Sequence, residues 1–66
     1  MDLDKTIQIY MRDLLLAGAT IEFKDLCLTI IYNENDETFD VIDEYNDVVV
    51  SYKKYISAEN YVLSTQ

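Results

Sequence analysis

Carboxylates are the side chains of this sequence that could carry chemistry, and they are concentrated between Asn33 and Asp47 (NENDETFDVIDEYND). More than half of the thirteen acidic residues lie in this segment, and no Lys or Arg does. They are Glu34, Asp36, Glu37, Asp40, Asp43, Glu44 and Asp47. Carboxylates at this density can perform acid–base catalysis, bind divalent cations, or contact the Arg and Lys clusters of a basic partner.

Catalysis is disfavoured by the composition. Acid–base catalysis by carboxylates needs a pocket that drives their pKa values apart, and a chain of 66 residues has little room for a deep cleft. The chain has no His, a single Gly and a single Cys, Cys27, which is predicted to fill space on a strand. We therefore expect a protein that is not an enzyme and has no cofactor.

A calcium loop is the second possibility, and the spacing fails to support it. Asn33, Asn35, Glu37 and Glu44 fall at the first, third, fifth and twelfth positions of an EF-hand-like loop. The sixth position is Thr38, where the sharp turn of such a loop requires Gly, and the residues that follow have the pattern of a strand. We expect no dedicated metal site.

The net charge of -8 favours the third possibility, a basic partner. It disfavours direct binding to nucleic acid or to an anionic membrane, because five cationic residues face thirteen anionic ones. Acidity that serves solubility alone is the alternative explanation. The six Tyr and two Phe are then expected in the core or in a protein interface, where Tyr is enriched.

Apolar spacing predicts a helix over residues 3–17. Its main face carries Leu3, Ile7, Tyr10, Met11, Leu14 and Leu15. Gly18 follows, where a left-handed C-terminal cap is expected. Ile9 and Leu16 lie together on the far side, beside Lys5, Arg12 and Asp13. They are either ordinary surface residues, residues covered by the C-terminal segment, or a small contact patch.

Strands are predicted over residues 20–23, 26–32, 38–44 and 48–53, with a turn at residues 45–47 in which Asn46 adopts a positive φ. Residues 55–66 are predicted to form a short helix capped by Ser57, with a continuing strand as the alternative. The expected fold is a single α+β domain. An N-terminal helix covers a small antiparallel sheet of three or four strands, and a short C-terminal helix follows.

Alternation along the predicted strands separates the acidic segment into two faces. Phe39 and Val41 are directed to the core, and Asp40, Ile42 and Glu44 to the outer face. We expect noncatalytic binding to a basic protein, in which the acids occupy a site that normally takes phosphates. The predicted partner-binding residues are Glu34, Asp36, Glu37, Asp40, Ile42 and Glu44.

Self-association of a small structural or regulatory domain is the alternative function. Ile31, Ile42 and Val49 are predicted to form an apolar streak on the outer face of the sheet. This streak, or the pair Ile9 and Leu16, would then form the contact of a homodimer.

The chain resembles a class of small inhibitors in its general character. A short, acidic, Cys-poor chain with a leading helix and with strands joined by NENDE and DEYND is similar to the proteins that phages and mobile elements use against host defences or DNA enzymes. Type II anti-CRISPR proteins and uracil-DNA glycosylase inhibitors are examples. The resemblance covers the whole chain but no motif, so it implies a partner class, a nucleic-acid-binding enzyme or complex, and no residue roles.

The expected location is the cytoplasm, which is the host cytoplasm if the protein is encoded by a phage. A lone Cys suits a reducing compartment. No apolar run approaches the roughly 20 residues needed to span a bilayer. The segment MDLDKTIQIYMRD lacks the basic and apolar regions of a signal peptide.

Overall fold

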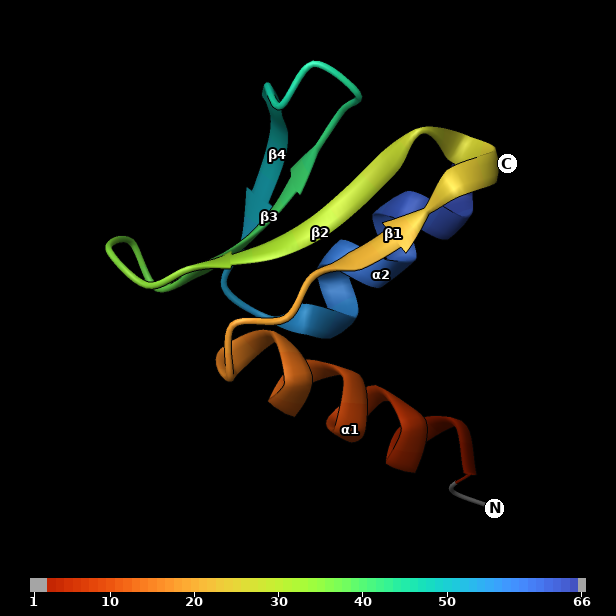
Figure 1. The fold of residues 1–66 in the computed structure, drawn as a ribbon. Coiled ribbons are helices and arrows are strands. Elements are labelled where there is room, and N and C mark those ends of the chain that lie inside the picture. The colour runs from red at the N-terminus through yellow and green to blue at the C-terminus, as the bar shows by residue number, and fades with distance from the viewer. Residues whose placement is uncertain (1–2, 66) are drawn as a thin grey trace.

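A computed structural model describes residues 3–65, with the backbone alone for residues 3 and 4. The elements are α1 (Leu3–Leu16), β1 (Ile21–Phe23), the 3₁₀ turn η1 (Lys24–Leu26), β2 (Leu28–Asn33), β3 (Thr38–Ile42), β4 (Val48–Tyr52) and α2 (Tyr55–Ser64). The strands form one antiparallel sheet in the order β1-β2-β3-β4 (Figure 1). The predicted α+β architecture is confirmed, and residues 55–64 are helix rather than strand.

Two backbone predictions are confirmed at turns. Gly18 has φ of 103°, and the amide of Ala19 donates to the carbonyl of Leu14 at 3.0 Å, which is the pattern of a Schellman cap at the end of α1. Asn46 has φ of 66° in the β3–β4 turn, as its side chain favours.

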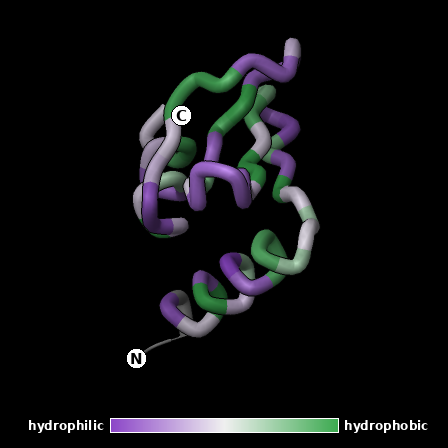
Figure 2. Tube along the Cα trace, turned by 90° about the vertical axis from the view of Figure 1, so that its left-hand side faces the viewer, coloured by the Kyte–Doolittle hydropathy of each residue, from purple (hydrophilic) through white to green (hydrophobic). Residues whose placement is uncertain are grey.

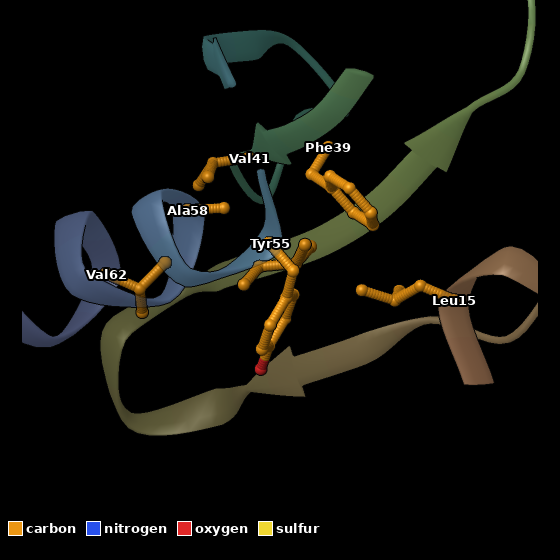
Figure 3. Packing of buried hydrophobic residues seen from close by; sticks show 7 residues of the cluster. Leu15, Phe39, Val41, Tyr55, Ala58 and Val62 are labelled. Atoms are coloured by element: carbon orange, nitrogen blue, oxygen red, sulfur yellow. The ribbon is translucent and has the colours of Figure 1, made fainter. Parts of the chain in front are cut away.

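The hydrophobic core lies between α2 and the inner face of the sheet. Tyr55, Ala58 and Val62 recur at helical spacing along α2 and are buried against Ile30, Phe39, Val41 and Leu15 (Figure 3). Phe39 and Val41 point to the core, as predicted. The small side chain of Ala58 lets α2 approach the sheet closely, so α2 contacts β2, β3 and β4.

The predicted packing of the N-terminal helix on the sheet is confirmed at β2, which α1 contacts. α2 covers more of the inner face, with contacts to β2, β3 and β4, and α1 lies beside α2 (Figures 1 and 2). Leu15, at the last turn of α1, is 1% exposed and points toward Tyr55, whereas Tyr10 on the same face is 63% exposed. Ile7 is exposed as well, and the predicted apolar side chain of Leu3 lies outside the described residues.

Three local predictions also need correction. α2 begins at Tyr55 with Lys54 as its N-cap, so Ser57 does not cap it. β2 begins at Leu28, and Cys27 is an exposed residue in the left-handed region with φ of 56° rather than a strand residue. β3 ends at Ile42, two residues before the predicted end of the strand.

Leu15 and its neighbour Leu16 offer a matched test of how α1 is attached. Leu15→Ala should lower the free energy of unfolding by about 2–5 kcal/mol, because it leaves a cavity between α1 and α2. Leu16 is 50% exposed, so Leu16→Ala should cost less than about 1 kcal/mol. Urea unfolding followed by circular dichroism measures both values, and equal losses would contradict this packing.

Candidate protein-binding surfaces

The acidic segment does not form one continuous surface. In an antiparallel sheet successive turns lie at opposite ends, so the β2–β3 turn and the β3–β4 turn are separated by the length of β3. Five residues of strand span about 16 Å. Glu34, Asp36 and Glu37 therefore lie at one end of the sheet, and Asp43, Glu44 and Asp47 at the other.

The β2–β3 turn is held in shape by Asn33. Its side-chain oxygen accepts from the amides of Asn35 at 3.0 Å and Asp36 at 3.3 Å, and its amide nitrogen donates to the carboxylate of Asp36 at 3.3 Å. Lys53 Nζ donates to the carbonyl of Asp36 at 3.0 Å. Asp36 therefore takes part in holding the turn, and it is exposed, as are Glu34 and Glu37 beside it.

Asp40 is 4% exposed, so the expectation that it contacts a partner from the outer face is wrong. Ile31 on β2 and Ser51 on β4 are its cross-strand neighbours. Its carboxylate accepts from Thr38 Oγ1 at 2.7 Å and from Asn33 Nδ2 at 3.3 Å. A buried carboxylate needs hydrogen-bond donors in place of water, and these two bonds supply them. They also connect the middle of β3 to the β2–β3 turn.

The tip of the β3–β4 hairpin presents the most exposed aromatic side chain among the described residues. Tyr45 is 76% exposed and lies next to Glu44. Asp43 Oδ1 accepts from the amides of Tyr45 at 2.8 Å and Asp47 at 3.0 Å, so this acid fixes the turn. Val48 and Val49 follow on β4 and are exposed.

Tyr45 and Val48 were not predicted to be contact residues. The sequence signal that could have identified Tyr45 is its place inside the tight turn DEYND, from which a side chain cannot reach the core.

The predicted apolar streak on the outer face is interrupted. Asp40 lies opposite Ile31, and a β-bulge between Val41 and Ile42 places Val48, rather than Val49, opposite Ile42. Ile31 and Ile42 are half-buried, while Val49 is exposed. The three residues therefore do not form one continuous apolar surface.

The two residues of the predicted patch on α1, Ile9 and Leu16, have different surroundings in the structure. Leu16 is exposed at the end of the helix, whereas Ile9 lines a groove between α1 and the start of α2. This groove brings α1 beside Lys53 and Lys54, a juxtaposition that local sequence patterns do not reveal.

A hydrogen-bonded acid joins the two helices. Glu59 on α2 accepts from Gln8 Nε2 on α1 at 3.0 Å and from the Tyr55 hydroxyl at 2.9 Å. Burial raises the pKa of the Tyr55 phenol well above its ordinary value, and the hydrogen bond to Glu59 and the charge of that carboxylate raise it further.

The part of the chain that the structure describes holds no group of three or more His, Cys, Asp or Glu side chains placed to bind a metal ion. Neither α1 nor α2, as described, is long and apolar enough to cross a bilayer. Comparisons with protein-family models, curated proteins and solved structures find no match to this chain.

Asp40 should behave as a structural acid. Asp40→Ala removes the acceptor of the half-buried donors of Thr38 and Asn33 and a buried side chain of β3, and should lower the free energy of unfolding by about 1–3 kcal/mol. Glu34→Ala removes an exposed acid of the same segment and should change the free energy of unfolding by less than about 0.5 kcal/mol. Denaturant unfolding of both variants tests this, and an Asp40→Ala variant as stable as the parent would contradict it.

Tyr55 should make the fold sensitive to alkaline pH. Its folded pKa lies above the ordinary value of about 10, so its contribution to stability is complete below pH of about 10 and is lost as the pH rises further. Tyr55→Phe should weaken the loss of stability between pH 9 and pH 11, measured by urea unfolding at each pH. Exposed Tyr45→Phe is the control and should retain the parent's pH dependence; identical profiles for all three proteins would refute the assignment.

Proposed function

We propose that this protein is a noncatalytic binding protein that contacts a basic protein surface with the tip of its β3–β4 hairpin. The observation that carries the proposal is the exposure of Tyr45 between Glu44 and Asp47, next to the exposed side chains of Val48 and Val49. Acids that serve solubility alone need no exposed aromatic and aliphatic side chains among them. This combination is typical of a protein contact.

The chemistry of the hairpin tip suits an Arg-rich partner. Carboxylates accept charge-assisted hydrogen bonds from guanidinium groups, and a Tyr ring packs against the guanidinium plane. The two hydrogen bonds to Asp43 Oδ1 hold the tip in place before binding, so little conformational entropy is lost on contact.

The partner class that we propose is a nucleic-acid-binding enzyme or complex. Arg and Lys clusters that bind phosphates also accept carboxylates, so a bound hairpin tip would exclude the nucleic acid and inhibit the partner. The resemblance in general character to phage and mobile-element inhibitors supports this class and a cytoplasmic site of action.

The test compares two variants with equal changes in charge. The tip variant Glu44→Gln/Tyr45→Ala/Asp47→Asn removes two charges and the exposed ring, and Glu34→Gln/Glu37→Gln removes two charges at the opposite end of the sheet. Each protein is immobilised and exposed to a bacterial lysate, and retained proteins are challenged with duplex DNA and with salt. The parent and the second variant should retain a protein that duplex DNA releases, and the tip variant should retain about tenfold less of it.

Two results would overturn the proposal. In the first, the tip variant retains the same protein as well as the parent does, which would exclude the hairpin tip. In the second, the retained protein is not displaced by duplex DNA, which would exclude competition with nucleic acid.

A further inference from the structure

The cationic residues of this acidic chain are gathered around one groove. Four of the five Lys and Arg residues line it: Lys5 and Arg12 from α1, and Lys53 and Lys54 from the segment that joins β4 to α2. The groove encloses about 720 Å³, which lies within the usual range of ligand-binding sites. The fifth cation, Lys24, lies at the other end of the sheet beside Glu22 and Asp43.

The groove also has an apolar lining. Ile9 and Ile56 are exposed along it, and Phe39 and Tyr55 belong to the buried core that it reaches. Lys5, Gln8, Ile9 and Arg12 share one face of α1 at helical spacing. An apolar surface bordered by cations suits a ligand that combines carboxylates with an apolar side chain.

Three of the four cations around the groove, Lys5, Lys53 and Lys54, make no ion pair among the described residues. The fourth, Arg12, pairs with Asp13 through Nη2 and Oδ1 at 3.2 Å. Lys53 donates one hydrogen bond to the carbonyl of Asp36, and an ammonium group has three donors. The nearby carboxylate of Glu59 already accepts from Gln8 and Tyr55.

We infer that this groove binds a short acidic segment of a partner protein, with an apolar side chain between the carboxylates. Lys5 and Arg12 are about 10 Å apart along the axis of α1, a distance that about three residues of extended chain span. At physiological salt, charges more than about 8 Å away are largely screened, so the acids at the far end of the sheet contribute little. Two carboxylates lie closer to the four cations: Asp13, which pairs with Arg12, and Glu59, which is bonded to Gln8. This site is separate from the hairpin tip and binds ligands of the opposite charge.

Other occupants fit the charges less well. A nucleic acid would extend beyond the groove toward Asp13 and Asp36, where its phosphates would be repelled. A second copy of this chain would bring further acids of its own, with a net charge of -8, close to Asp13 and Glu59 at the edge of the groove.

The test uses labelled peptides of about six residues, with Leu and Phe between two pairs of Glu, and a sibling peptide with Gln in place of Glu. Fluorescence anisotropy should show that the acidic peptide binds about tenfold more tightly than its Gln sibling, with a difference that shrinks as salt rises. Lys53→Gln/Lys54→Gln should weaken binding of the acidic peptide about tenfold, whereas Lys24→Gln should leave it unchanged.

A matched pair of substitutions tests the apolar lining of the groove. Ile9→Gln should weaken the binding of both peptides, and Leu16→Gln, an equally exposed position of α1 outside the groove, should weaken neither. Circular dichroism of each variant confirms that it is folded before binding is measured.

Several outcomes would overturn the inference. These are equal binding of the acidic peptide and its Gln sibling, equal losses in the Lys24 and Lys53/Lys54 variants, or displacement of the peptide by a short oligonucleotide. If sedimentation velocity showed a dimer, and Lys53→Gln/Lys54→Gln converted that dimer to a monomer, the occupant of the groove would be a second copy instead. Because these changes leave the hairpin tip intact, failure here is distinguishable from failure of the proposed basic partner.

Discussion

The packing of α2 on the inner face of the sheet is the interaction on which the rest of this structure depends. Ala58 and Val62 are fully buried against strands that include Ile30 and Val41. A domain of this size has one small core, so the helix that occupies the sheet leaves no equivalent place for the other. α1 is attached through Leu15, Met11, its contacts with β2 and the Gln8–Glu59 hydrogen bond, and one of its faces is left to form the wall of a groove.

The same packing separates the charges of the chain. The segment from Lys53 to Tyr55 must turn from β4 into α2, and this turn places two cations next to the cationic face of α1. The antiparallel order of the strands divides the acidic segment between two ends of the sheet. A chain with a net charge of -8 consequently has acidic and basic surfaces of its own, and the local arrangement rather than the net charge decides what each surface can bind.

Local features of this fold were predictable from the sequence because they depend on local physical chemistry. Gly18 and Asn46 adopt the positive φ angles that their side chains permit, and alternation places Phe39 and Val41 in the core. The predicted cap of α2 is wrong because Ser57 favours a cap position, whereas the helix with Tyr55 buried begins three residues earlier, after Lys54. Packing of the helix onto the sheet outweighs the preference of one side chain for the cap position.

The remaining features depend on contacts between distant segments. Both predicted helices have an apolar face, and the sequence does not show that α2, with Ala58 fully buried, would cover more of the sheet than α1. Asp40 has the sequence position of a solvated acid, and cross-strand neighbours on both sides bury it. The groove combines residues almost fifty positions apart, Lys5 with Lys53 and Lys54, so no local pattern contains it.

The separation of charges is tested most directly by recording amide ¹H–¹⁵N spectra of the labelled protein during titration with two short peptides, one rich in Glu and Leu and one rich in Arg. The Glu-rich peptide should shift the amide signals of residues 5–12 and 53–56, and the Arg-rich peptide those of residues 43–49. If both peptides shifted the same signals, or if the Glu-rich peptide shifted none, the chain would not have two separate binding surfaces of opposite charge, and the central claim would be wrong.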